Sequence, residues 1–474
     1  MKYHTTVSRR DFMKGLGLTG AGLSAAIAAS PAFHDLDEIA NSPEGQWKRS
    51  WWVKEADKPT LEIDWSVIKR HDASNLQQPQ TALNKGIGQV DFDRIKGEAD
   101  ARNRDYVAAK KSGYSLKDFA LADAANTKVG GSWVGPQKVK GPAKYGVSKW
   151  EGNPEENLSM IRSAMRFFGA RQVAVIELES STTKKIIWAK NRQGKPFSFE
   201  NVEVGYENSD KFAVPDNCRW MITFNIPMGK QAWATAPALI GTAANDGNKA
   251  RAELAFNLIQ EFFRGLGYQC LAFPGGDPNS LCPSAAAAVL SGMAESSRTN
   301  HFITPEEGPV TRVHTMITDM PLAPTKPIDA GLFRFCHTCK RCSNYCPSEA
   351  ISKSDAPSWD IPTPPPQYQE AYYSSLGKRA FWKVDPKCGI YQLELGQKLC
   401  GICLALCSFN VASAASVHSL IKPTISLTPT LNGFFWKMGD MMEYGIKSDP
   451  GDWWKLNLPV YDIDNSIGAQ VHYH

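Results

Sequence analysis

Eight cysteines between residues 335 and 409 carry the clearest chemical signal in the sequence. Four of them follow the spacing C-x2-C-x2-C-x3-C and are followed by Pro347, and four more lie further along the chain; in order they are Cys336, Cys339, Cys342, Cys346, Cys388, Cys400, Cys403 and Cys407. In the first spacing, three thiolates bind one [4Fe–4S] cluster and the fourth binds a neighbouring cluster. Two such clusters need eight thiolates, and this segment supplies them.

The second group of cysteines departs from a regular repeat. Counting back from Cys407 and Cys403, Cys400 takes the second ligand position, and the first position is occupied by Gln397. Cys388 is the free thiol nearby, so we predict that it replaces the missing ligand. The exchange of the fourth thiolate between clusters then predicts two sets: Cys336, Cys339, Cys342 and Cys407 on cluster 1, and Cys346, Cys388, Cys400 and Cys403 on cluster 2.

Two other interpretations of these cysteines exist, a disulfide framework and a pair of four-cysteine zinc sites. The C-x2-C-x2-C triplet and Pro347 favour iron–sulfur clusters over both. The remaining cysteines are Cys218, Cys270 and Cys282, and two of the three lie in or beside apolar, strand-like runs. We expect these three to be small buried hydrophobic residues.

Length and charge limit the possible classes of function. A chain of 474 residues with 42% hydrophobic residues can form roughly two to four domains with a sizeable core. The net charge of +5 is small and its basic residues are scattered, so nucleic acid is not an expected partner.

The first 32 residues have the pattern of a twin-arginine export signal. Arg9 and Arg10 precede a mildly apolar stretch that ends at small residues near Ala32. The glycine pattern of a dinucleotide site also occurs here, at residues 15–20, but no strand precedes it, and we treat it as coincidental. No later apolar run reaches spanning length, so a soluble or peripheral mature chain is expected.

The middle of the chain predicts an α+β layer structure. Asn153 and Pro154 are typical of a helix start, and apolar residues recur at helical spacing up to residue 168; a second helix is expected over residues 254–266. Strands are expected at 172–178, 184–190, 219–226 and 269–273. Prolines at 321, 324 and 327 predict an extended connector that leads into Cys336.

Together these features resemble the catalytic subunit of the reductive dehalogenases, which are corrinoid and iron–sulfur enzymes. The resemblance spans nearly the whole chain and rests on the leader, the cysteine runs and several motifs: residues 150–157, 167–170, 266–268, 319–331 and 432–435. It implies a nitroreductase-like corrinoid-binding domain beside a ferredoxin-like module with two [4Fe–4S] clusters. The chain has no D-x-H-x-x-G motif, which agrees with base-off corrinoid binding without a histidine ligand. The corrinoid-contacting residues are unknown.

The predicted organisation comprises a signal peptide, an N-terminal region, a catalytic domain, a cluster module with a Pro-rich and aromatic insertion, and a C-terminal extension. Their respective ranges are 1–32, 33–145, 146–330, 331–415 with the insertion at 354–387, and 416–474. The resemblance implies a reductase at the end of an anaerobic respiratory chain, on the outer face of the cytoplasmic membrane. Its implied partners are a small organohalide such as a chlorinated or brominated alkene, an upstream electron donor and a small hydrophobic membrane-anchor subunit.

Proton delivery is the point where the sequence departs from the family pattern. The resemblance implies a tyrosine about twenty residues before Leu266-Gly-Tyr268 and a basic partner, for which Arg298 is the match, but residues 242–250 contain no tyrosine. Lys249 lies nearest the expected place, and Asp246 is close by. Either could donate a proton, or both could be ordinary exposed residues at a helix start. Tyr268 and Tyr206 are further candidates.

Two other functions fit part of the sequence. A ferredoxin-type electron-transfer subunit would need the clusters but not the 300 or so residues before them. An epoxyqueuosine-reductase-like enzyme, which uses cobalamin and two clusters on transfer RNA, conflicts with an export leader and with the lack of a basic patch.

Overall fold

The computed structural model describes residues 49–75, 83, 86–362, 375–410, 422–424 and 445–463. Residues 52–465 form one compact unit; the other unit joins residues 1–51 with 466–474, and only residues 49–51 of it are described. The export signal predicted at 1–32 and the motif at 432–435 therefore lie outside the described residues. The divisions predicted within residues 52–465 stay predictions.

An antiparallel sheet of four strands forms the centre of this unit, in the order β2-β6-β10-β7. Its strands are β2 (Gln172–Glu177), β6 (Trp220–Pro227), β10 (Thr311–Thr318) and β7 (Cys270–Leu271). Ile222 of β6 lies opposite Val175 on one side and Met316 on the other. Because side chains alternate along a strand, these three residues point to the same face.

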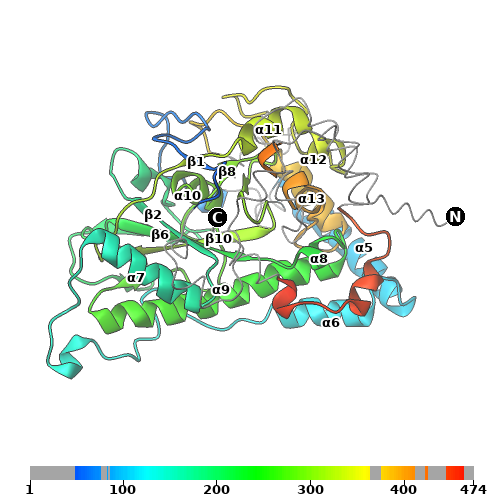
Figure 1. The fold of residues 1–474 in the computed structure, drawn as a ribbon. Coiled ribbons are helices and arrows are strands. Elements are labelled where there is room, and N and C mark those ends of the chain that lie inside the picture. Colours follow the sequence, from blue (N-terminus) through cyan, green and yellow to red (C-terminus); the bar gives the residue numbers. More distant parts are fainter. Residues whose placement is uncertain are drawn as a thin grey trace, which may run out of the picture. The chain divides into compact units, whose positions relative to one another are not determined.

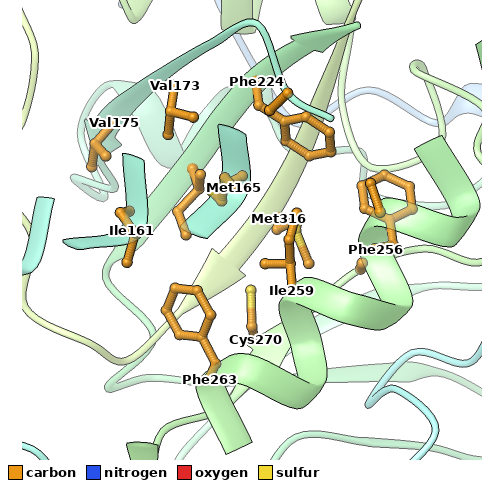
Figure 2. Packing of buried hydrophobic residues seen from close by; sticks show 14 of the residues in the cluster. Ile161, Met165, Val173, Val175, Phe224, Phe256, Ile259, Phe263, Cys270 and Met316 are labelled. Atoms are coloured by element: carbon orange, nitrogen blue, oxygen red, sulfur yellow. The ribbon is translucent and has the colours of Figure 1, made fainter. Parts of the chain in front are cut away.

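Helices cover both faces of the sheet (Figure 1). Against the face of Ile222 pack α7 (Pro154–Phe167) and α9 (Leu239–Leu266), which bury a cluster that includes Ile161, Met165, Ile259 and Phe263 (Figure 2). The opposite face, with Ala174 and Val313, packs against α10 (Ser284–Leu290). The sheet is thus the middle of three layers.

Helix α9 is the longest element, with 28 residues and a length of about 42 Å. Its C-terminal half places Phe256, Ile259 and Phe263 in the core. Its N-terminal half carries buried polar residues, among them Asn245, Asp246 and Asn248. One rigid helix therefore joins the apolar core to a polar region.

Smaller elements surround these layers. A three-stranded sheet has the order β3-β5-β4, from Phe197–Glu200, Phe212–Pro215 and Tyr206–Glu207. Two-stranded pairs join β1 (Lys54–Glu55) to β11 (Ile328–Asp329) and β8 (Glu295–Ser296) to β9 (Phe302–Ile303). The other α-helices among the described residues are α5 (Gln89–Ala108), α6 (Leu116–Ala125), α8 (Lys230–Trp233), α11 (Leu332–Cys339), α12 (Arg341–Asn344), α13 (Asp385–Glu394) and α14 (Ile402–Ala405).

The expected α+β class is confirmed, as is the helix that begins at Pro154. The Asn153 side chain accepts a hydrogen bond from the Glu156 N–H at 2.8 Å, and the Glu156 carboxylate accepts one from the Asn153 N–H. This reciprocal cap is the one that its residue types favour. Cys218, Cys270 and Cys282 are buried as expected.

The strand predicted at residues 184–190 is wrong. A 3-10 turn, Thr183–Ile186, replaces its first half. Thr183 Oγ1 donates to the Glu177 carbonyl and accepts from the Glu179 N–H, which closes the chain into a turn directly after β2. The Ile187 and Trp188 carbonyls then accept hydrogen bonds from the Arg70 side chain, in place of a neighbouring strand. The apolar run is buried without forming a ladder.

The second predicted helix, at 254–266, is longer than expected because α9 begins at Leu239. Asp246 is consequently not an exposed helix-start residue; only 4% of it is exposed. In the part of the chain that the structure describes, we find no helix both long and apolar enough to cross a membrane.

Phe263→Ala should lower the free energy of unfolding by about 3–5 kcal/mol, because the change removes a fully buried ring and leaves a cavity between α9 and the sheet. Leu254→Ala, on the same helix but half exposed, is the matched control and should cost well under about 1 kcal/mol. Denaturant unfolding followed by circular dichroism measures both. Equal losses for the two variants would contradict this account of the core.

Candidate active site

The eight cysteines of the predicted clusters line two neighbouring cavities. The first is bordered by Cys336, Cys339, Cys342, Cys403 and Cys407. The second, with a volume of about 380 Å³, is bordered by Cys346, Cys388, Cys400 and Cys403 together with charged and amide side chains. That volume falls in the range of roughly 300–1000 Å³ that is usual for small-molecule sites.

Short helices and tight turns position the thiols. Helix α11 carries Cys336 and Cys339, and a Lys340 residue in the left-handed conformation (φ 53°) separates it from α12 with Cys342. Gly401 separates Cys400 from α14 and has φ 80°; a Cβ atom there would lie 2.4 Å from the Trp233 ring. Only glycine fits this turn without moving the tryptophan.

A buried carboxylate fixes the start of α11. Glu295 Oε2 accepts hydrogen bonds from the Ala330 N–H at 3.0 Å and the Leu332 N–H at 2.8 Å, and its Oε1 accepts one from Thr60 Oγ1 at 2.6 Å. A carboxylate at a helix N-terminus binds N–H groups that have no partner within the helix. Glu295 thereby ties the end of the proline-rich connector to the first cysteine run.

Burial, and then repulsion between neighbouring thiols, raises the pKa values of the cysteines, and the two ligand sets stay a prediction. Cys336 is influenced by Cys407 and Cys339, whereas Cys403 is influenced by Cys388, Cys400 and Cys346. One contact crosses between the sets, from Cys403 to Cys342. Burial raises the pKa of both Cys400 and Cys407 to about 12. These thiols would thus release protons when they bind metal.

Gln397 and Cys388 make different contacts in the structure. Gln397 Oε1 accepts a hydrogen bond from Thr242 Oγ1 at 2.9 Å, and its Nε2 donates to the Pro237 carbonyl at 2.9 Å. Gln397 thus fastens the second cysteine run to the start of α9. Cys388, on α13, borders the second cavity with the other three thiols of its predicted set.

Arg298 lies at the first cavity and is almost fully buried. Its guanidinium donates to the carbonyls of Cys336 and His337, at 2.8 and 3.1 Å, and to those of Ser352 and Ser354, both at 2.8 Å. It also stacks 4.0 Å from the centre of the Phe381 ring. Among the described residues, those that border the second cavity do not include Arg298. The structure therefore does not bring Arg298 together with Lys249. The assignment of Arg298 as the basic partner of the proton donor stays a prediction.

Lys249 borders the second cavity, and the buried Asp246 is its ion-pair partner. Lys249 Nζ donates to Asp246 Oδ1 at 2.9 Å, and Asn245 Nδ2 donates to the same oxygen at 3.1 Å. Lys249 borders the cavity and its side chain is 28% exposed. Asp246 thus holds the Lys249 side chain at the cavity wall, and a role for Lys249 as proton donor stays a prediction.

A residue of β10 completes this wall. Arg312 donates through Nε and Nη2 to Asn245 Oδ1, at 3.0 and 2.7 Å. Arg312 lies opposite Ile226 in the sheet and so shares the α9 face with His314 and Met316. Its contact with Asn245 is therefore a polar continuation of the packing between α9 and β10.

A second ion pair, between Arg192 and Asp277, borders the same cavity. Arg192 Nη1 contacts Asp277 Oδ2 at 3.2 Å, and the Asn279 N–H donates to Asp277 Oδ1 at 3.0 Å. Burial by itself raises the pKa of Asp277, but Arg192, the Asn279 N–H, Lys249 and Arg312 outweigh it and lower the pKa below the ordinary value. Asp277 is thus an ionised acid that shares one electrostatic network with Lys249 and Arg312.

Towards the thiols, the cavity is bordered by Lys383 and His301. Lys383 pairs with Asp385 at 2.8 Å, and its Nζ lies 3.2 Å from His301 Nε2. Burial, and then Lys383 and Arg312, lower the pKa of His301 far below its ordinary value, so the ring is neutral and its Nε2 accepts from Lys383. Lys383 thus places a positive charge beside Cys388 and Cys403.

The two tyrosines considered as proton donors are engaged elsewhere. Tyr268 donates its hydroxyl to the Trp150 carbonyl at 2.8 Å, and Tyr206 donates to Glu200 Oε2 at 2.9 Å. Within the described part of the chain, neither borders the second cavity.

Sequence reasoning missed Arg312, Asn245, Asp277 and Arg192. A signal for Arg312 was present: it is the one charged residue in the otherwise apolar or neutral run 311–318, on the same strand face as His314 and Met316. A charge in a central strand marks a polar site, because a buried charge needs partners. Asn245 has no comparable signal.

Comparisons with known proteins identify the family. The family described as "Reductive dehalogenase subunit" matches residues 48–322. The chloroethene reductive dehalogenase of Dehalococcoides mccartyi (strain VS) is 30% identical over 539 residues, which cover 98% of this chain and 99% of that protein. The tetrachloroethene reductive dehalogenase of Sulfurospirillum multivorans is 32% identical over 274 residues, covering 57% of this chain and 51% of that protein.

Solved structures show the same fold. A reductive dehalogenase structure described in terms of B12-dependent dehalogenation has a TM-score of 0.60 at 18% identity, covering 92% of this chain and 55% of that chain. The catabolic reductive dehalogenase NpRdhA in complex with 3-bromo-4-hydroxybenzoic acid has a TM-score of 0.57 at 18% identity, covering 94% of this chain and 55% of that chain. The chain thus spans about half the length of these solved chains.

Cys388→Ala should lower the iron content from about eight to about four atoms per chain, because cluster 2 would lose one of its four thiolates. Anaerobic purification followed by iron and sulfide analysis measures this. Cys282→Ala removes a buried thiol outside both sets and should leave the iron content unchanged. If Cys388→Ala retained the full iron content, the assignment of Cys388 as a ligand would be wrong.

Proposed function

The chain belongs to the reductive dehalogenase family, and we propose that it replaces the halogen of a small chlorinated or brominated alkene by hydrogen. The carbon–halogen bond breaks, a carbon–hydrogen bond forms, two electrons and one proton are consumed, and a halide ion is released. The substrate class is supported by the relatives, whose names specify chloroethene, trichloroethene and tetrachloroethene.

We propose two [4Fe–4S] clusters and a corrinoid as cofactors. The clusters would be held by Cys336, Cys339, Cys342 and Cys407 and by Cys346, Cys388, Cys400 and Cys403, whose grouping around two cavities fits this donor set. A bound corrinoid supplies low-valent cobalt, which reduces carbon–halogen bonds. The second cavity suits such a group because it combines the thiols of cluster 2 with amide side chains, such as Asn279 and Gln392, that can bind carboxamides.

The observation that carries this proposal is the meeting of a thiol set and a proton donor at one cavity. Lys249 borders the same space as Cys346, Cys388, Cys400 and Cys403. We propose that Lys249 donates the proton and that Asp246, which accepts from Lys249 Nζ, keeps it directed at the cavity. Asn245 holds Asp246 from its other side.

Other parts of the proposal rest on the sequence alone. They are twin-arginine export, a location on the outer face of the cytoplasmic membrane, a small hydrophobic anchor subunit and an upstream electron donor.

Arg298 is proposed to act at the first thiol set, where four donated hydrogen bonds hold the backbone around Cys336 and Ser352. Its positive charge there would favour the anionic state of a bound cluster.

Halide release tests the function directly. The chain, produced anaerobically with corrinoid and supplied with a chemical electron donor, should release halide from chlorinated or brominated ethenes in equal amount to the dehalogenated product. Haloarenes form the comparison panel and should react more slowly. A protein with full clusters and corrinoid that releases no halide from any compound would instead indicate an electron-transfer subunit.

Lys249→Met should reduce turnover by about a hundredfold or more, which is the usual contribution of a positioned acid, and should flatten the pH–rate profile. Iron and corrinoid contents should not change, since Lys249 is not a proposed ligand. Lys326→Met, at an exposed lysine paired with Asp57, is the control and should have normal turnover. Normal turnover and an unchanged pH profile in Lys249→Met would exclude Lys249 as the donor.

A further inference from the structure

We propose that Arg312 forms a halide-binding site in the second cavity, where its free guanidinium edge receives the chloride or bromide ion that the reaction releases. This inference rests on the proposed function for its biological meaning. The site itself is argued from the charges and hydrogen bonds around Arg312.

The first observation is that the bonding partner of Arg312 is neutral. Two of its nitrogens, Nε and Nη2, donate to the amide oxygen of Asn245, which is 6% exposed. Within the described part of the chain, Nη1 has no hydrogen-bond acceptor from the protein, while Arg312 borders the cavity. The guanidinium is therefore fixed in place with one edge left to bind another group.

The second observation is that the nearby acids are already paired. Asp246 accepts from Lys249 and Asn245, and Asp277 accepts from Arg192 and the Asn279 N–H. The cations Arg192, Lys249 and Arg312 border the cavity here together with the Asp277 carboxylate, and Asp246 lies outside the cavity lining. Arg312 is half-buried and is the cation without a direct ion pair among them; Asp277 and Asp246 act on it only at longer range. A partly desolvated charge in this state favours an anionic ligand.

The chemistry of the reaction supplies such an anion. The organohalide enters as a neutral molecule, and a halide ion exists only after the carbon–halogen bond has broken. A fixed positive group that binds the halide but gains little from the neutral substrate stabilises the charge as it develops. Asn245 would be the positioning residue, since its oxygen sets the direction of the guanidinium.

Two variants separate this site from a purely structural role. Arg312→Gln removes the charge. Asn245→Asp keeps the size of the side chain but places a carboxylate on Arg312, which would neutralise it. Each should weaken chloride binding by about tenfold or more, the scale of a lost charge-assisted hydrogen bond. Arg219→Gln, at an exposed arginine paired with Glu177, is the control and should bind chloride normally.

Chloride binding is measured on the purified holoenzyme, which is first exchanged into gluconate buffer and then given a known concentration of chloride. The readout is the broadening of the ³⁵Cl magnetic resonance line and its reversal by bromide. The wild-type chain and Arg219→Gln should broaden the line, and both site variants should lose most of this effect. Iron and corrinoid contents verify that each variant is intact; if Arg312→Gln does not fold, Asn245→Asp carries the test. Equal broadening in wild type and variants would overturn the site.

The outcome is independent of the proposed function, because chloride binding needs neither an electron donor nor an organohalide. Chloride binding that depends on Arg312 in a protein without dehalogenase activity would refute the proposed function and leave the anion site. Dehalogenation without chloride binding at Arg312 would refute the site alone. Bromide-soaked crystals should show anomalous scattering within hydrogen-bond distance of Arg312 Nη1, and bromide elsewhere would also contradict the proposal.

Discussion

Helix α9 packs in the apolar core at one end and borders a polar cavity at the other, and the rest of the structure depends on this arrangement. The C-terminal half of α9 buries Phe256, Ile259 and Phe263 against the sheet, and its N-terminal half borders the second cavity with Asn245 and Lys249. Because a helix is rigid over this length, packing at the core fixes where the polar side chains lie at the cavity. The stability of the core and the geometry of the site are thus linked through the same backbone.

The seam between α9 and β10, which is the line of side-chain contacts from Phe256 to Arg312, changes from apolar to polar towards the cavity. Phe256 lies against the His314 ring, Asn248 hydrogen-bonds His314 Nε2 at 3.1 Å, and Asn245 binds Arg312 at the cavity. Burial, and then the Arg312 charge, lower the pKa of His314 to about 3, so its ring is neutral within this seam. His314 Nε2, Asn248 and Asn245 each have a hydrogen-bond partner in this seam, which lowers the cost of burying them.

The sequence predicts the parts of the molecule that local rules determine. Asn153, Pro154 and Glu156 give the start of α7 correctly. The eight thiols border two cavities, with Cys403 at both, and their division into two ligand sets stays a prediction. The strand expected at 184–190 fails because Arg70, over a hundred positions away in the chain, binds carbonyls that a strand would need. Asp246 and Arg312 come together only through the packing of α9 on β10. Sequence spacing contains no information on that contact, so the cavity wall could not be predicted.

The central claim is that electrons reaching this chain end in the breaking of a carbon–halogen bond. The most direct measurement is a single-turnover titration of the fully reduced, anaerobic holoenzyme with a chlorinated ethene, following cluster oxidation by electron paramagnetic resonance together with halide and product. We predict one halide ion and one hydrogen-substituted product for every two electrons lost. Oxidation of the clusters without halide release, or clusters that stay reduced in the presence of every organohalide, would contradict the account.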